Sequence, residues 1–179
     1  MSLPRCSVFI AMSLDGYIAT PENGLEWLDI AQSPDGEDYG YAEFMASVDA
    51  LILGRNTYDV VSKFPDWPYK EKKVFVLTHR PLKPLHNEVS VSGSIKSILE
   101  KLEKDGIKNV YLDGGKTIQT GLQEKVVDDL TVSVLPILLG KGISLFGDLP
   151  AHMKLQNTSA LAYPSGLVQL KYETPSFHP

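Results

Sequence analysis

The residues with the clearest chemical meaning are Gly114, Gly115, Lys116 and Thr117, which follow the mostly apolar residues 110–113. This pattern predicts a buried strand, a glycine turn and the start of a helix. The unpaired N–H groups and partial positive charge of a helix N-terminus favour a phosphate or pyrophosphate. Glycines also let a ligand lie against the main chain. A plain strand-to-helix turn that needs glycine only for its backbone angles is the alternative.

Two other predicted strands, residues 50–53 and 73–77, end in residues of a similar kind. In an open α/β sheet, ligands bind beyond the carboxyl ends of parallel strands, so three such segments on one edge would form one site. A dinucleotide with an extra phosphate needs a pyrophosphate cradle and separate cationic groups for the ribose phosphate. The alternative for each arginine is a solvated surface charge. The residues at these two strand ends are Gly54, Arg55, Asn56, Thr57, Thr78, His79 and Arg80.

The remaining chain supplies the elements that would position these residues. Residues 7–12 are nearly all apolar and predict another strand that is covered on both faces. Helical spacing predicts helices that follow Asp38 and Ser94 and a third from about residue 116 to 124, while Asn56 or Thr57 would cap a short one. Alternating residues 130–134 predict a strand with one drier face, and residues 154–173 a hairpin. We therefore expect one α/β domain over residues 1–179, with helices on both faces of a mixed sheet.

A long loop is predicted before the Asp38 helix, and it contains Trp27 and Leu28. Long structureless loops are uncommon in compact domains unless they cover a site, and a merely solvated loop would not favour a large aromatic side chain. We therefore expect a lid, with a disordered insertion as the alternative.

Composition excludes several classes of function. The net charge of −5 leaves no footprint for nucleic acid or an anionic membrane surface. Cys6 is the single cysteine and the four histidines are scattered, so neither a disulfide framework nor a metal site is expected. No apolar run reaches membrane-spanning length and no signal peptide is recognisable, which predicts a cytoplasmic protein.

Four motifs together resemble one known family. They are residues 12–19 (MSLDGYIA), 54–58 (GRNTY), 112–115 (LDGG) and 135–146 (LPILLGKGISLF). In order and spacing they are similar to the dihydrofolate reductase-like superfamily, particularly the C-terminal reductase domain of bacterial riboflavin-biosynthesis enzymes and its stand-alone relatives. The resemblance extends from about Arg5 to Tyr172.

The resemblance implies a three-layer α/β/α fold with a mostly parallel mixed sheet and an antiparallel C-terminal hairpin. It also implies NADPH as the hydride donor, preferred over NADH because unpaired cationic groups lose more without the 2′-phosphate. By this analogy Ala11, Ile18 and Ala19 line the nicotinamide pocket. The phosphates and the adenosine end would be held by Gly54, Arg55, Asn56, Thr57, Thr78, His79 and Arg80, and the pyrophosphate by Gly114, Gly115, Lys116, Thr117 and Ile118.

The substrate is less well defined by the same analogy. Folate reductases place an acid on the first helix, and counting back from Gly54 puts Asp38 there, although Glu43 shares that helix and Asp38 also suits a helix cap. Folate enzymes also grip the glutamate tail with an arginine, but residues 58–71 contain none. A ribose phosphate would need a cation, for which Lys141 is a candidate.

Three functions follow as hypotheses. The first is an NADPH-dependent oxidoreductase that transfers a hydride to a small heterocycle, either a pyrimidine such as 5-amino-6-(5-phosphoribosylamino)uracil or a pterin-like compound. The second is a catalytically silent nucleotide-binding or regulatory module. The third is an interaction protein whose apolar residues 136–146 form a dimer surface. A homodimer is expected for the same reason.

Overall fold

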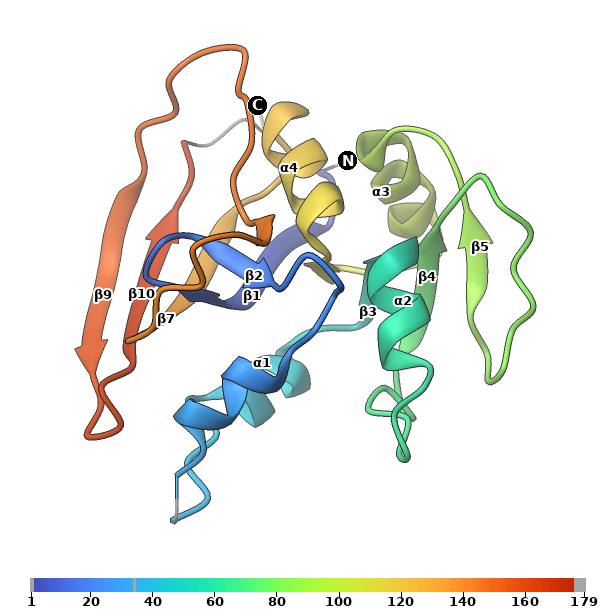
Figure 1. Cartoon of the computed structure of the whole chain (residues 1–179). Coiled ribbons are helices and arrows are strands. Elements are labelled where there is room, and N and C mark those ends of the chain that lie inside the picture. Colours follow the sequence, from blue (N-terminus) through green and yellow to red (C-terminus); the bar gives the residue numbers. More distant parts are fainter. Residues whose placement is uncertain (1, 34, 176–179) are drawn as a thin grey trace.

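The structure is a computed structural model that describes residues 2–33 and 35–175. One eight-stranded sheet has the strand order β5-β4-β3-β6-β1-β7-β10-β9. In Figure 1 the strands at one edge, β5 and β4, are green, and those at the other edge, β10 and β9, are red and orange. A small second sheet pairs β2 (Tyr17–Ala19) with β8 (Ile143–Ser144). The strands of the large sheet are β1 (Arg5–Ser13), β3 (Ala50–Gly54), β4 (Lys73–Leu77), β5 (Val89–Val91), β6 (Asn109–Asp113), β7 (Asp129–Leu135), β9 (Gln156–Ala162) and β10 (Val168–Glu173).

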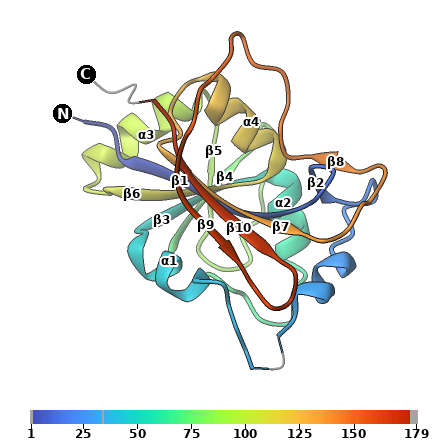
Figure 2. The same cartoon turned by 90° about the vertical axis from the view of Figure 1, so that its left-hand side faces the viewer.

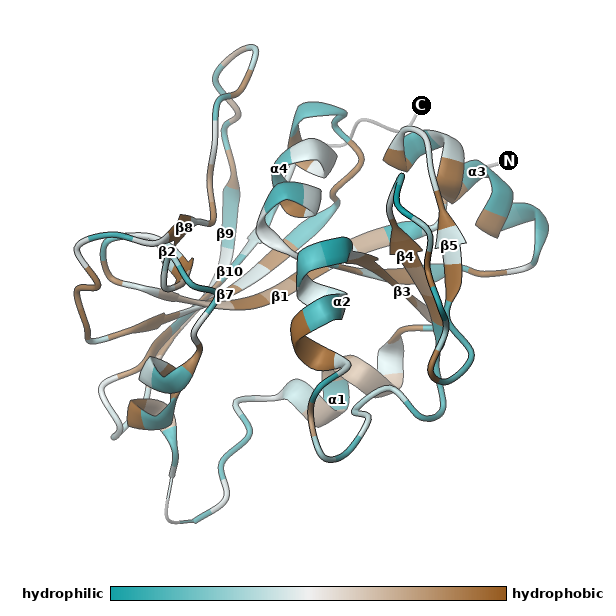
Figure 3. Ribbon diagram, turned by 45° about the vertical axis from the view of Figure 1, so that its right-hand side comes forward, coloured by the Kyte–Doolittle hydropathy of each residue, from teal (hydrophilic) through white to brown (hydrophobic). Residues whose placement is uncertain are grey.

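Every pair from β5 across to β7 is parallel, and β10 and β9 add to that edge as an antiparallel hairpin. The sequence-based prediction of a mostly parallel mixed sheet with an antiparallel C-terminal hairpin is therefore confirmed. The central strands are the most apolar, and Figure 3 shows β3 and β4 in brown. Such runs are typical of parallel strands that are covered on both faces.

Helices cover both faces of the sheet. On one face lie α3 (Ile95–Lys104) and α4 (Gly115–Gln123), whose buried Ile98, Leu99 and Ile118 pack on β1, β3 and β6. On the other face lie α1 (Tyr41–Ser47) and α2 (Arg55–Val61), which join a second core around Leu51 and Leu53. Figure 2 shows α3 and α4 above the sheet and α1 below it. The parallel strands therefore carry helices on two sides, as α/β folds require.

Two local predictions need correction and one is confirmed. Helix α2 begins at Arg55 with Gly54 as its N-cap, so neither Asn56 nor Thr57 caps it. Strand β7 was expected to expose its Thr131 and Ser133 face to solvent, but both side chains are buried in the strand that lies between β1 and β10. Ser94 caps α3 as expected, accepting a hydrogen bond from the Ser97 N–H over 3.1 Å.

The long loop contains the 3-10 helix η1 (Glu26–Ala31). Its Trp27 is buried against Leu135 of β7 and against Leu167, the residue directly before β10. This aromatic side chain therefore anchors the loop to the sheet. Among the described residues, no helix is long and apolar enough to span a membrane.

Candidate active site

One large cavity opens at the carboxyl ends of β3, β4 and β6. Its volume is about 810 Å³, within the range of small-molecule sites in proteins. All three strand ends that the sequence singled out contribute to its lining. The predicted site residues found there are Ala11, Ile18, Ala19, Gly54, Arg55, Asn56, Thr57, Thr78, His79, Arg80, Gly114, Gly115, Lys116 and Thr117.

Two glycine turns meet at the floor of this cavity. Gly114 has a φ of +108°, and a Cβ there would lie 2.7 Å from the Thr57 Oγ1 and 3.3 Å from the Gly54 nitrogen. Only glycine tolerates both the backbone angle and the close approach. The β3–α2 and β6–α4 turns therefore pack directly against each other, which brings the starts of the two helices to one place.

The start of α4 suits an anionic group. Its N-cap Gly114 makes no side-chain hydrogen bond to the first turn, and the first turn contains no acidic residue. Its early N–H groups and the helix dipole are thus available to an oxygen-rich ligand. Lys116 adds a cation at the same turn. These residues fit the pyrophosphate of a dinucleotide.

Two arginines lie at one end of the cavity and share a single carboxylate. The Arg55 Nε lies 2.8 Å from Asp59 Oδ1, and the Arg80 Nη2 lies 3.4 Å from Asp59 Oδ2. Arg55 also donates through Nη1 to the Pro81 carbonyl oxygen over 3.0 Å. Because one carboxylate serves two guanidinium groups, this end keeps a net positive charge, as a ribose phosphate requires.

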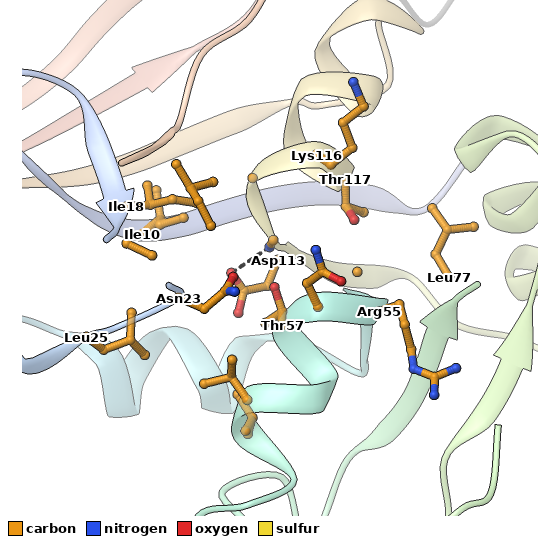
Figure 4. Close-up of a pocket in the computed structure, with 18 of the residues that line it drawn as sticks. Ile10, Ile18, Asn23, Leu25, Arg55, Thr57, Leu77, Asp113, Lys116 and Thr117 are labelled. Carbon is orange, nitrogen blue, oxygen red and sulfur yellow. Dashed lines mark hydrogen bonds between the residues drawn. The ribbon is translucent and has the colours of Figure 1, made fainter. Parts of the chain in front are cut away.

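The opposite end of the cavity is apolar. Figure 4 shows Ile10, Ile18 and Leu25 on one side of Asp113, and Arg55 on the other side. Leu25 and Leu28 come from the long loop, which therefore borders the site, whereas Trp27 is part of the anchor described above. The long loop therefore forms part of the cavity wall through Leu25 and Leu28.

Asp113 is a polar residue at the centre of the cavity that sequence reasoning did not single out. Its Oδ1 accepts a hydrogen bond from the Gly114 N–H over 2.8 Å (Figure 4). Burial raises the pKa of Asp113 to about 6, against the opposing effects of the hydrogen bonds from the Gly114 amide and the Tyr111 side chain. A carboxyl group with such a pKa is half protonated near pH 6 and keeps roughly a tenth of its protons at pH 7.

Three tyrosines surround this carboxyl group. Burial, and next to it the charge of Asp113, raise the pKa of Tyr41 to about 12. The same two causes, in the same order, raise the pKa values of Tyr69 and Tyr111. The phenols therefore stay protonated at neutral pH. The position of Asp113 directly before the glycine pair is the one sequence signal that could have found it.

Three residues considered from the sequence do not line the cavity. Ile118 is fully buried in the core, and its N–H bonds the Gly114 carbonyl over 2.8 Å. Asp38 is exposed and accepts hydrogen bonds from the Gly40 and Ala42 N–H groups, both over 2.9 Å. Lys141 is exposed and also lies away from the lining.

Gly40, and not Asp38, is the N-cap of α1, and the Asp38 contacts favour a structural role just before this helix over an acid role. Hydrogen bonds from the Ala42 and Gly40 amides lower the pKa of Asp38, so its carboxylate stays ionised at neutral pH and has no proton to donate. We expect Asp38→Ala to lower the melting temperature through the lost hydrogen bonds to the Gly40 and Ala42 amides, while leaving turnover per folded molecule unchanged. Thermal unfolding and steady-state rates of the same sample check this. A large loss of turnover without loss of stability would contradict it.

The mostly parallel sheet with its antiparallel C-terminal hairpin is the dihydrofolate reductase-like fold. Dihydrofolate reductase from Enterococcus faecalis, in a structure complexed with NADP(H), superposes with a TM-score of 0.68 at 15% sequence identity. That match covers 98% of this chain and 100% of the other. At this identity the likeness establishes the fold.

The family follows from closer matches. The RibD C-terminal domain family matches residues 4–169, and the chain belongs to that family. A putative riboflavin biosynthesis protein from Shewanella sp. PV-4 is 37% identical with a TM-score of 0.91, over 96% of this chain and 99% of the other. The uncharacterized protein YwjB of Bacillus subtilis (strain 168) is 32% identical over 92% of this chain and 95% of its own length. Family and fold together support a reductase-type role.

Proposed function

We propose that this protein is an NADPH-dependent reductase that transfers a hydride to a small heterocyclic or carbonyl substrate. The observation that carries the proposal is the single cavity that joins a helix start, an arginine pair and an apolar end containing Asp113. The NADP(H) bound to the fold relative from Enterococcus faecalis supports the choice of cofactor.

The residues that line the cavity suggest a position for each part of the cofactor. The uncapped start of α4, with Lys116 and Thr117, would hold the pyrophosphate. Arg55 and Arg80 would hold the ribose 2′-phosphate, which NADH lacks. Ala11, Ile18 and Ala19 would pack against the nicotinamide ring. NADPH supplies a hydride when bound, so the protein's task is to orient the partners and exclude water.

Asp113 would supply the proton that must accompany the hydride. Reduction of a C=N or C=O group takes the hydride on carbon and a proton on nitrogen or oxygen. The protonated Asp113 carboxyl lies at the boundary of the apolar end and would give its proton to that atom, then take another from water. A pKa near 6 suits a general acid that works close to neutral pH.

A homodimer stays a prediction. In the segment 136–146 that suggested it, Leu138 and Phe146 have 68% and 45% of their surface exposed. We expect a dimer in sedimentation velocity at micromolar concentration, and a shift toward monomer in Leu138→Lys. A wild-type protein that sediments as a monomer would contradict the prediction.

The proposed activity is tested by following NADPH consumption with neutral dihydropterins, pyrimidines and quinones. Oxidation of NADPH that requires both protein and acceptor, with a product two hydrogens heavier, supports the reductase. NADPH binding without turnover of any acceptor would instead favour the catalytically silent nucleotide-binding module.

A further inference from the structure

The two ends of the cavity differ in charge. Among the described residues that line it, the cationic or titratable basic side chains are Arg55, His79, Arg80 and Lys116. All four come from the end of β4 or the starts of α2 and α4. In Figure 4, Arg55 lies on the far side of Asp113 from Leu25, and Lys116 extends away from both. The basic side chains among the described lining residues therefore lie apart from the apolar end.

The other end offers apolar walls and one carboxyl group. Phe9 and Ile10 come from β1, Leu25 and Leu28 from the long loop, and Val60 and Phe64 from α2 and the turn after it. Asn23 and Asp113 are polar residues that border this end (Figure 4).

We infer that the second ligand of this cavity is a small, flat, uncharged ring compound and that its phosphate esters are excluded. This inference rests on the proposed function, because it assigns the cationic end to the cofactor. The proposed substrate therefore differs from a phosphoribosyl pyrimidine, because the ribose phosphate of that compound would need a cation near the reacting ring.

The physical reason is the cost of burying an unpaired anion. A phosphate at the apolar end would leave water for walls that offer no cation, and it would approach the Asp113 carboxylate. A neutral ring would instead bury its faces against Phe9 and the leucines, with Asn23 and Asp113 as its hydrogen-bonding partners. The same walls therefore favour one ligand and reject the other.

A matched pair of ligands tests this inference. Equilibrium dialysis compares 6-hydroxymethyl-7,8-dihydropterin with its diphosphate ester, both with and without saturating NADP+. We expect the neutral compound to bind NADP+-loaded protein at least about tenfold more tightly. Binding of the ester at equal or higher affinity, or binding of neither compound, overturns the inference. Because NADP+ binding is measured first and separately, its failure would count against the proposed function instead.

A variant that adds the missing cation makes the test sharper. Leu25→Lys is expected to narrow the difference between the two ligands to less than about threefold, while Leu25→Met, the matched control, keeps it. Unchanged NADP+ affinity in both variants verifies that the site is folded. If Leu25→Lys retains both NADP+ binding and the full preference for the neutral compound, the charge of the cavity wall does not determine the preference. That result would contradict the inference.

Discussion

Asp113→Asn is expected to lower kcat by about 10² to 10⁴-fold, the usual contribution of a general acid. The amide keeps the size of the side chain but has no acidic proton to donate. Asn can still accept the hydrogen bond that the Gly114 N–H now gives to Asp113, so NADPH affinity should change little. Steady-state rates and a separate NADPH titration measure the two effects.

The same variant is expected to be more stable than the wild type. Burial raises the pKa of Asp113 to about 6 from the ordinary value of 3.8, so the folded state favours the neutral acid. That contribution is fully present below pH 3.8 and is lost as the pH rises through 6. Above pH 7 the ionised carboxylate therefore costs up to about 3 kcal/mol of unfolding free energy, which Asn removes.

Denaturation at several pH values tests this pattern. Asp113→Asn and wild type should unfold alike near pH 3, diverge progressively between pH 4 and 6 and keep a constant difference above about pH 7. Asp105→Asn, at the exposed end of α3, serves as the control. A variant that loses activity but is destabilised at every pH would indicate a structural role for Asp113.

The double variant Arg55→Gln/Arg80→Gln is expected to weaken NADPH binding by about 10 to 100-fold and NADH binding by much less. The two guanidinium groups now share Asp59. Removing both leaves the Asp59 carboxylate beside the place proposed for the 2′-phosphate, which adds repulsion to the lost attraction. Nicotinamide fluorescence titrations of both cofactors measure the change in preference.

Asp59→Asn provides the opposite test at the same place. It frees both guanidinium groups from their shared partner, so NADPH affinity should rise and its dependence on salt should increase. The double variant Lys101→Gln/Lys104→Gln, on the exposed side of α3, serves as the charge-matched control for the arginine double variant. Equal losses of NADPH and NADH affinity in the double variant would show that these arginines do not recognise the 2′-phosphate.

The three strand ends could be predicted from sequence because each signal is local. An apolar run, a glycine and then polar residues at a helix start mark a strand-to-helix turn without knowledge of the rest of the chain. Parallel pairing then brings Gly54 and Asp113 to one edge, since β3 pairs with both β4 and β6. Helix phase explains Ile118, which turns toward the core on α4 while Lys116 stays exposed.

The role of Asp113 could not be predicted because it depends on packing between distant segments. Its pKa is raised by burial, with Tyr41, Tyr69 and Tyr111 brought to it from three separate parts of the chain. The anchor of Trp27 depends likewise on Leu135 and Leu167. Asp38 was placed by counting residues along a loop of unusual length, where register carries little information.

The central claim is a cavity built for NADPH, and one titration tests it most directly. The wild-type protein is titrated with NADPH and then with NADH, and reduced-nicotinamide fluorescence is followed. The structure predicts saturable NADPH binding at least about tenfold tighter than NADH binding, because only NADPH carries the phosphate that Arg55 and Arg80 would hold. Binding of neither cofactor, or equal binding of both, would contradict this account.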